Sequence, residues 1–186
     1  LDFNGDSNAV FIFQIGSTLT TASNAGVVTI NRENYLMIGT TRDLVPSSSR
    51  LVKADPAQGS WPTVSGSVRP AGYAWGAQSQ ISGYYDPVPT RDSVRGWVYI
   101  VADNFDRSSP AYLYRATPQS FTDRSSWQGW SAVSGWNKAP TPLWGDRIGE
   151  MSIKQIDGRT VLSYFNNSTG NMEVRVANTP TELGTA

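Results

Sequence analysis

The strongest constraint on the fold of this 186-residue chain is one segment that recurs three times at a fixed spacing. Residues 49–56, 111–118 and 172–180 each combine apolar and basic side chains with an Ala and a closing Pro. The closing prolines lie 62 residues apart, so the chain length equals three such units. Self-similarity at a fixed period is the signature of a fold built from stacked copies of one unit.

A second pattern repeats between these segments. Residues 61–76 and residues 130–145 both read W-x-x-V-S-G, then eight further residues, then W-G. The pattern therefore marks the same place in the first two units and supports a common structure for them.

Short β-branched and aromatic runs, bounded by Gly, Pro, Asn and Asp, fill each unit and predict strands. The run 97–102 is apolar at every position, which is typical of a strand covered by neighbouring sheets on both faces. The predicted strands are Ala9–Ile15, Val27–Ile30, Tyr35–Ile38, Ser49–Ala54, Ala77–Ile81, Trp97–Ala102, Ala111–Ala116, Met151–Ile156, Thr160–Phe165 and Glu173–Ala177.

The order of strand, strand, strand and Trp-marked strand predicts an all-β, propeller-like fold with about three four-stranded blades. The units lie near residues 24–66, 77–135 and 148–186. A β-sandwich is the alternative, but it does not explain the period. Propellers usually have about four to eight blades, so a second chain or a missing segment would complete this one.

Charge and composition exclude several functions. Fifteen Lys and Arg balance fifteen Asp and Glu, which argues against a nucleic-acid-binding protein. The chain has no Cys and no His, so disulfides, thiolate nucleophiles, His-containing triads and Cys/His zinc sites are excluded. Acid–base chemistry must therefore come from carboxylates, Tyr, Lys or Arg. No run approaches the roughly 20 apolar residues of a membrane span.

Residues 31–186 resemble the C-terminal part of a bacterial β-propeller family linked to endo-D-arabinanases. The resemblance rests on short motifs spread over most of the chain: Gly96-Trp-Val-Tyr-Ile-Val with Arg107, Tyr112-Leu-Tyr-Arg-Ala, Ser126-Trp-Gln-Gly-Trp130, Gly149-Glu-Met-Ser-Ile153, Leu162-Ser-Tyr-Phe165 and Val174-Arg-Val-Ala-Asn-Thr-Pro180.

The resemblance implies a five-bladed propeller with a substrate cleft at one end of its axis. It further implies a secreted enzyme that hydrolyses or binds arabinan-type cell-envelope polysaccharide. In that family, Asp residues of the N-terminal blades supply much of the catalysis. The corresponding Asp-Leu-Gly and Gly-Asp-Thr motifs have no clear counterpart here, and the nearest match is Gly16-Ser17-Thr18.

Residues 1–30 are similar to a different family, the ice-binding β-solenoids. The similarity rests on Leu1-Asp-Phe-Asn-Gly-Asp6 and the stretch Asn8–Asn24, which is rich in Thr and Ser. A fusion, a trimmed fragment, and a propeller whose first strands only look similar all fit this observation. It adds an ice-binding or adhesive function to the alternatives.

Glu150 is the best candidate for a catalytic carboxylate. Aligning Ile81 with Ile153 pairs Gln78 with Glu150, and strand alternation then directs one set of side chains to the axis. That axis-facing set is Gln78, Gln80, Glu150 and Ser152, whereas Ser79, Ile81, Met151, Ile153, Val28 and Ile30 form the packing set. A Glu on the axis can act as a general acid or base. The alternative is that Glu150 pairs with Arg147 or Lys154 and holds neighbouring blades together.

Glycoside hydrolysis usually requires two carboxylates, about 5–10 Å apart. The available partners of Glu150 are Asp103, Asp106 and Asp146, each at a predicted strand end or in a loop. Asp103 and Asp106 lie in a short segment where turn formation is the commoner reason for Asp.

Aromatic and polar side chains outside the repeated pattern are candidates for sugar binding. Aromatic rings stack on the C–H faces of sugars, although they also fill cores. The four repeated residues Trp61, Trp75, Trp130 and Trp144 are interpreted as blade packing. The substrate-binding candidates are Gln78, Gln80, Tyr84, Tyr85, Arg91, Arg107, Trp127 and Trp136. No EF-hand-like motif is present, so no cofactor is expected and an axial Ca²⁺ has no sequence support.

Overall fold

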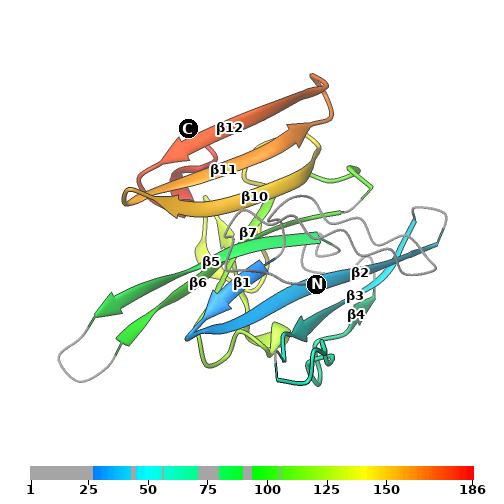
Figure 1. Cartoon of the computed structure of the whole chain (residues 1–186). Coiled ribbons are helices and arrows are strands. Elements are labelled where there is room, and N and C mark those ends of the chain that lie inside the picture. The colour runs from blue at the N-terminus through cyan, green and yellow to red at the C-terminus, as the bar shows by residue number, and fades with distance from the viewer. Residues whose placement is uncertain (1–26, 43–44, 56, 71–79, 90–93, 105) are drawn as a thin grey trace.

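The computed structural model describes residues 27–42, 45–55, 57–70, 80–89, 94–104 and 106–186. Their strands form three antiparallel sheets, each of which follows the chain order without a crossover (Figure 1). The first sheet contains β1 (Val27–Ile30), β2 (Glu33–Arg42), β3 (Val45–Lys53) and β4 (Arg69–Pro70). The second contains β5 (Gln80–Pro89), β6 (Val94–Asp103), β7 (Tyr112–Ala116), β8 (Gln128–Ser131) and β9 (Gly135–Asn137). The third contains β10 (Ile148–Ile156), β11 (Arg159–Asn166) and β12 (Asn171–Ala177).

Tight hairpins join the first two strands of the first and third sheets. Asn31 and Arg32 connect β1 to β2 with φ of 50° and 68°, and Asp157 and Gly158 connect β10 to β11 with φ of 49° and 75°. Two consecutive residues with positive φ are the mark of a type I′ turn, whose twist matches that of the flanking strands. These two turns fix the register of both hairpins.

Two hydrophobic cores separate the three sheets. The first core lies between the first and second sheets and includes Val28, Leu51 and Ile100. The second lies between the second and third sheets and includes Leu113, Met151 and Ile153. The second sheet is therefore buried on both faces, which explains why β6 is apolar at nearly every position.

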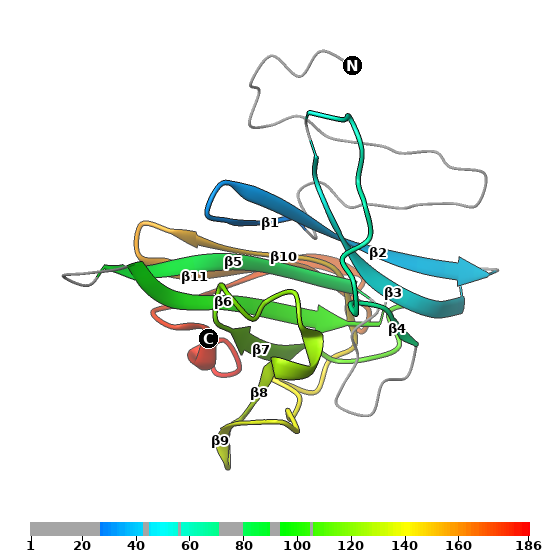
Figure 2. The ribbon, with the colours of Figure 1, turned by 90° about the horizontal axis from the view of Figure 1, so that it is seen from below.

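The first strand of each sheet lies nearest to its neighbours. β5 contacts both β1 and β10, and the three sheets are stacked in chain order around these strands (Figures 1 and 2). Consecutive antiparallel sheets with adjacent first strands are the arrangement of β-propeller blades. The all-β, propeller-like prediction is confirmed, and Val28, Ile30, Ile81, Met151 and Ile153 are all buried, as the packing set requires.

The number of strands per sheet differs from the prediction of four. Among the described residues, the first sheet has four strands, the second has five and the third has three. In the second sheet, β5 and β6 pair along their whole length, from Gln80↔Asp103 to Pro89↔Val94. Trp130 lies in β8 as predicted, whereas Trp61 lies in no strand.

Polar ties hold neighbouring sheets together. The Arg124 side chain, 2 % exposed, donates from Nη1 to the Ser49 oxygens at 3.0 and 3.3 Å and to the Ser67 carbonyl at 3.0 Å. Between the second and third sheets, the Ile153 backbone N–H donates to Ser82 Oγ at 3.0 Å. A buried donor or acceptor that loses its hydrogen-bond partner raises the free energy of the folded chain. These contacts therefore fix the relative position of the sheets.

Candidate functional site

Glu150 lies at an interruption of the innermost strand of the third sheet. The register of β10 on β11 shifts between Gly149 and Ser152, so Glu150 and Met151 both stand opposite Tyr164. Glu150 has φ of 45° in this bulge, a conformation that non-glycine residues rarely adopt. A β-bulge changes the direction of a side chain, and bulges are common next to active sites.

Arg107 holds the Glu150 side chain in place. Its Nε donates to Glu150 Oε1 at 3.0 Å, and its Nη2 forms an ion pair with the same oxygen. The guanidinium lies over the Phe165 ring, 4.4 Å from the centroid. Its aliphatic stem packs on Gly149, where a Cβ would come within 2.7 Å of Arg107 Cγ. Arg107 itself has φ of 57°, so both partners of the ion pair have unusual backbone conformations.

The Glu150 side chain pairs with a residue that neither interpretation of Glu150 named. The predicted alternatives were an axis-facing acid or base and a structural pair with Arg147 or Lys154. The ion pair instead joins Glu150 to Arg107, a residue 43 positions earlier in the chain and itself a predicted substrate-binding residue. The other carboxylate oxygen, Oε2, is buried and has no hydrogen-bond partner among the described residues.

Asp103 is the buried carboxyl group of the site. It is the last residue of β6 and has no exposed surface. Burial raises the pKa of Asp103 well above its usual range, and the negative charges of Glu150 and Asp106 raise it further. Three of the four predicted catalytic carboxyl groups are therefore close enough for their charges to interact: Asp103, Asp106 and Glu150.

Two other predicted residues surround Asp103. Gln80 stands directly opposite Asp103 on β5, so both side chains lie on the same face of the second sheet. Asp106 is exposed, and its Oδ1 accepts a hydrogen bond from the Ser108 backbone N–H at 3.0 Å. Asp106 therefore has the turn-forming role that was predicted as its commoner function, and it contributes charge to the site.

Asp146 belongs to a different cluster. Its Oδ2 accepts a hydrogen bond from Asn166 Nδ2 at 3.1 Å, and the same amide nitrogen donates to Glu173 at 3.1 Å. Glu173 also accepts from Tyr164 and Thr169, and these hydrogen bonds, with that of Asn166, lower its pKa. Asp146 therefore takes part in this hydrogen-bond network, and its role as a catalytic partner of Glu150 stays a prediction.

Three of the predicted aromatic binding residues pack between neighbouring sheets. Trp127 is only 2 % exposed, stacks on Phe121 and donates from Nε1 to the Phe121 carbonyl at 2.8 Å. Tyr84 contacts the Thr160 hydroxyl at 3.0 Å across the second core, and burial raises its pKa to about 12. Tyr85 packs against the first core. Trp127 is buried and therefore inaccessible to a ligand, whereas Tyr84 and Tyr85 are only partly buried and remain predicted binding residues.

Trp136 lies in a cluster that the sequence did not reveal. The Arg115 guanidinium lies 3.9 Å from the Trp97 ring centroid and 4.3 Å from that of Trp136, so the two indoles enclose it. Tyr99 on β6 also lies near Trp136 on β9, with ring centroids 6.1 Å apart. These side chains come from β6, β7 and β9, and only the register of the sheet brings them together.

The repeated tryptophans do not share one role. Trp130 and Trp144 pack against the second core, as predicted. Trp61 is 42 % exposed, so its interpretation as a packing residue is wrong. Trp75 lies outside the described residues, as do the predicted binding residues Gln78 and Arg91.

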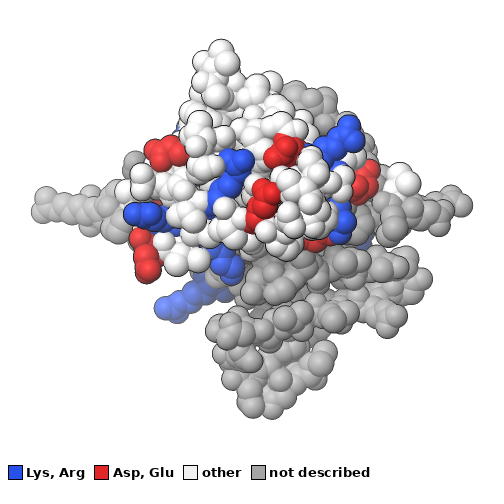
Figure 3. Space-filling view, turned by 90° about the horizontal axis from the view of Figure 1, so that it is seen from above, with Lys and Arg blue, Asp and Glu red and all other residues white. Residues whose placement is uncertain are grey.

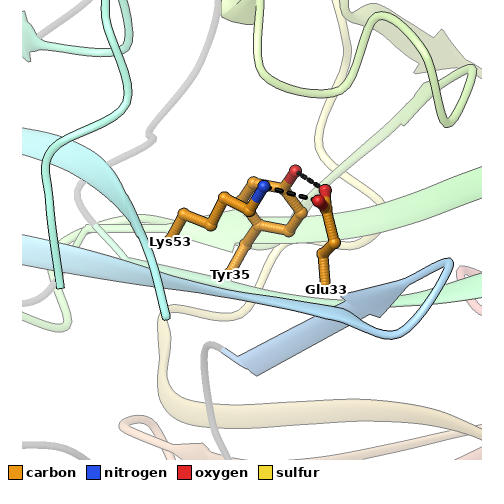
Figure 4. A network of polar contacts seen from close by, with 3 residues as sticks. All are labelled: Glu33, Tyr35 and Lys53. Atoms are coloured by element: carbon orange, nitrogen blue, oxygen red, sulfur yellow. Dashed lines mark hydrogen bonds and ion pairs between the residues drawn. The ribbon is translucent and has the colours of Figure 1, made fainter. Parts of the chain in front are cut away.

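A second polar network lies on the first sheet, away from Glu150. Glu33 accepts a hydrogen bond from the Tyr35 hydroxyl at 2.7 Å and forms an ion pair with Lys53 (Figure 4). Burial and the neighbouring Glu33 raise the pKa of Tyr35 to about 12. Glu33 and Lys53 are nearly half exposed, and the Tyr35 ring packs edge-on against Phe121. The network therefore supports the β2–β3 pairing and carries no catalytic arrangement.

The described residues contain no group of three or more His, Cys, Asp or Glu side chains arranged to hold a metal ion. Among them there is also no helix long and apolar enough to cross a membrane.

Comparison with known proteins identifies the family. A family model described as "Domain of unknown function (DUF4185)" matches residues 8–186. The chain belongs to the DUF4185 family. It is 68 % identical over 163 residues to the "Uncharacterized 35.9 kDa protein in asd 3'region" of Mycolicibacterium smegmatis. That match covers 87 % of this chain but 49 % of the relative, so the chain spans about half of that protein's length.

Other similarities are partial. An ice-binding protein of Nostoc sp. (strain HG1) is 53 % identical over 47 residues, which cover 24 % of this chain and 18 % of that protein. An α-L-arabinofuranosidase structure from Lactobacillus brevis aligns with 89 % of this chain and 55 % of its own, at 14 % identity and a TM-score of 0.45. An exo-1,5-α-L-arabinanase structure from a bovine ruminal metagenomic library aligns with 90 % and 56 %, at 12 % identity and a TM-score of 0.37. Structural similarity at this level carries no information about activity.

Proposed function

We propose that this DUF4185 protein is a secreted glycoside hydrolase of the endo-D-arabinanase type that acts on arabinan-type polysaccharide. The observation that carries the proposal is the bulge in β10, where Glu150 and Arg107 form an ion pair beside the buried Asp103. Unusual backbone conformations held in place by surrounding structure are concentrated at functional sites. Carboxyl groups in unlike environments are the arrangement that acid–base catalysis requires.

Each residue of the site has a separate role in the proposed reaction. The oxygen of a water molecule bonds to the anomeric carbon of the sugar as the glycosidic C–O bond breaks; Glu150 takes a proton from that water, Asp106 gives a proton to the leaving oxygen, and Arg107 orients the Glu150 carboxylate. Asp103 has no exposed surface, so it acts on Glu150 through its charge and not by contact with substrate. Asp106 is the second exposed carboxyl group near the site. Glycosidases commonly use two carboxyl groups in this way.

The test is the release of reducing ends from arabinan by the wild-type chain and by Glu150→Gln. Loss of a catalytic acid or base typically lowers the rate by about 10²–10⁴-fold. Asp157→Asn is the matched control, because Asp157 is exposed in the β10–β11 turn and Asn also accepts its positive φ, and it should retain activity. Equal activity of Glu150→Gln and the wild type would refute the assignment of Glu150.

A non-catalytic carbohydrate-binding protein is the second candidate. It is favoured by the complete burial of Asp103 and by the involvement of Glu150 Oε1 in the ion pair, because both reduce access to the carboxyl groups. Binding of arabinan without any product release, unchanged in Glu150→Gln, would select this function over hydrolysis.

A further inference from the structure

A cluster of side chains surrounds Arg115 on the face of the second sheet that packs against the third sheet. Arg115 on β7 stands opposite Tyr99 on β6 and opposite Gln128 on β8, so the three side chains share one face. Trp97, two residues before Tyr99, lies on the same face, and Trp136 on β9 completes the group. We call these five residues the Arg115 cluster: Trp97, Tyr99, Arg115, Gln128 and Trp136.

The Arg115 cluster is separate from the candidate site around Glu150. Trp97 precedes Asp103 by six residues on β6. A strand rises by about 3.3 Å per residue, so these two side chains are about 20 Å apart and lie toward opposite ends of the strand. All five side chains of the cluster are only partly buried, so each keeps some surface in contact with solvent.

Three contacts fix the orientation of the Arg115 guanidinium. It lies between the indoles of Trp97 and Trp136, and its Nε donates to Gln128 Oε1 at 2.9 Å. The two cation–π contacts fix the plane of the guanidinium, and the hydrogen bond fixes its rotation within that plane. A ligand would therefore meet a donor group that is already ordered, which lowers the entropy cost of binding.

The terminal nitrogens of Arg115 are not used within the described part of the chain. Arg107, Arg124 and Arg175 also lie over aromatic rings, and each donates from a terminal nitrogen to a protein oxygen. Arg115 donates only from Nε, and neither of its Nη atoms has an acceptor among the described residues. The stacked position by itself does not explain this difference, because the other three arginines are stacked as well.

The positive charge of Arg115 also lacks an anionic partner. Among the described residues, no carboxylate forms an ion pair with it. Asp86 stands opposite Trp97 on β5, but its Oδ1 accepts a hydrogen bond from Gln155 Nε2 at 3.3 Å. Burial lowers the pKa of Arg115, as expected for a cation that has lost water without gaining an anion.

We infer that the Arg115 cluster is a second ligand site, which binds a sugar that carries a carboxylate or phosphate group. The planar guanidinium can donate from two nitrogens to two oxygens of one such group. The indoles of Trp97 and Trp136 and the ring of Tyr99 offer apolar surface to the C–H groups of the sugar, whereas a free inorganic anion would use the guanidinium alone. The inference does not rest on the proposed hydrolase activity, because the cluster shares no residue with the Glu150 site.

The charge of the molecule as a whole gives an acidic ligand little reason to bind elsewhere. The chain has no net charge, and Figure 3 shows basic and acidic side chains interspersed on the face that carries the third sheet. Long-range attraction of an anion is therefore weak. Selection of an acidic sugar depends on a local arrangement such as the one around Arg115.

Binding can be followed by NMR of the 186-residue chain through the indole Nε1–H signals of Trp97 and Trp136, assigned with Trp97→Phe and Trp136→Phe. The acidic probes are D-glucuronate and D-glucose 6-phosphate, and the comparison probes are D-glucose and inorganic phosphate. We expect at least one acidic sugar to shift both signals and to bind about tenfold more tightly than glucose or phosphate. The better of the two acidic sugars identifies the carboxylate or the phosphate as the preferred group.

Variants at two stacked arginines separate ligand binding from a structural role. Arg115→Gln should weaken binding of the acidic sugar by about tenfold or more, because the ligand loses its charged partner. Arg115→Lys keeps the charge but lacks the two coplanar terminal nitrogens, so its affinity should be intermediate. Arg175→Lys is the matched control: Arg175 lies over Trp144, but its Nη1 donates to backbone carbonyls, so this variant should bind the sugar as the wild type does.

Three results would overturn the inference. The first is that neither acidic sugar shifts the two indole signals. The second is equal affinity for the acidic sugar and for glucose or inorganic phosphate, because the cluster would then not combine recognition of charge with recognition of the sugar. The third is unchanged affinity in Arg115→Gln or, if that variant does not fold, in Arg115→Lys.

Discussion

At the scale of single residues, Arg107 and Glu150 are the most unusual feature of the molecule. Each has a positive φ, and for a residue with a side chain this conformation costs roughly 1–2 kcal/mol. Glu150 lies within strand β10, where a positive φ is rare, whereas Arg107 lies in the connection between β6 and β7. The ion pair therefore joins two positions that both have unusual backbone conformations.

Asp103 makes the stability of the protein dependent on pH. Burial raises its pKa in the folded chain well above the value of 3.8 expected for the unfolded chain. Between these two pKa values the folded chain binds more protons, so the free energy of unfolding falls as pH rises. A difference of one pKa unit is worth about 1.4 kcal/mol.

We therefore expect Asp103→Asn to remove this loss of stability. Urea unfolding at pH 5 and pH 8 should show a smaller decrease in the free energy of unfolding for the variant than for the wild type. Asp106→Asn is the control, because Asp106 is exposed and should keep most of the wild-type pH dependence. Parallel pH profiles for the wild type and Asp103→Asn would contradict the burial argument.

At the scale of secondary-structure elements, the Asp157-Gly158 turn fixes the register of β10 on β11 and hence the position of the bulge. Gly158 has φ of 75°, and a Cβ there would meet nothing within 4 Å. Gly158→Ala should therefore destabilise the chain through backbone strain alone, by about 1 kcal/mol. The matched control is Gly145→Ala, which also has open space but no positive φ. Thermal unfolding measures both, and equal midpoints for the two variants would contradict this view of the turn.

The sequence predicts the strands well because their signals are local. Val27–Ile30 matches β1 at both ends, and the period of 62 residues correctly indicates repeated sheets. The strand counts were less accurate, since the short outer strands β4 and β9 have two and three residues and little pattern of their own.

The candidate site could be predicted only in part. Strand alternation predicts Glu150 and Gln80 as site residues, because alternation is a property of each strand by itself, and their role stays a prediction. The bulge at Glu150 and its pairing with Arg107 depend on contacts 43 residues apart in sequence. Trp127 was misjudged for the same reason: its exclusion from the repeat says nothing about the Phe121 ring on which it stacks.

At the scale of the whole molecule, neighbouring sheets are joined by apolar cores and by a few buried polar ties. Arg124 is the largest of these ties, since one side chain of the second unit reaches two residues of the first. Its guanidinium also lies 5.5 Å from the Trp127 ring centroid. The association of the first two sheets therefore depends on a buried cation as well as on hydrophobic contact.

Arg124→Met tests this dependence. The Met side chain fills much of the space but removes the Arg124 donor from the buried Ser67 carbonyl, and an unsatisfied buried polar group costs about 1–3 kcal/mol. We expect urea unfolding to show a loss of about 2–3 kcal/mol. Arg159→Met, at an exposed position in β11, should change stability by less than about 0.5 kcal/mol.

Arg124→Lys keeps the charge but lacks the planar guanidinium that donates to several acceptors at once, so it should recover only part of the loss. If Arg124→Met is as stable as the wild type, the first core alone holds the two sheets together.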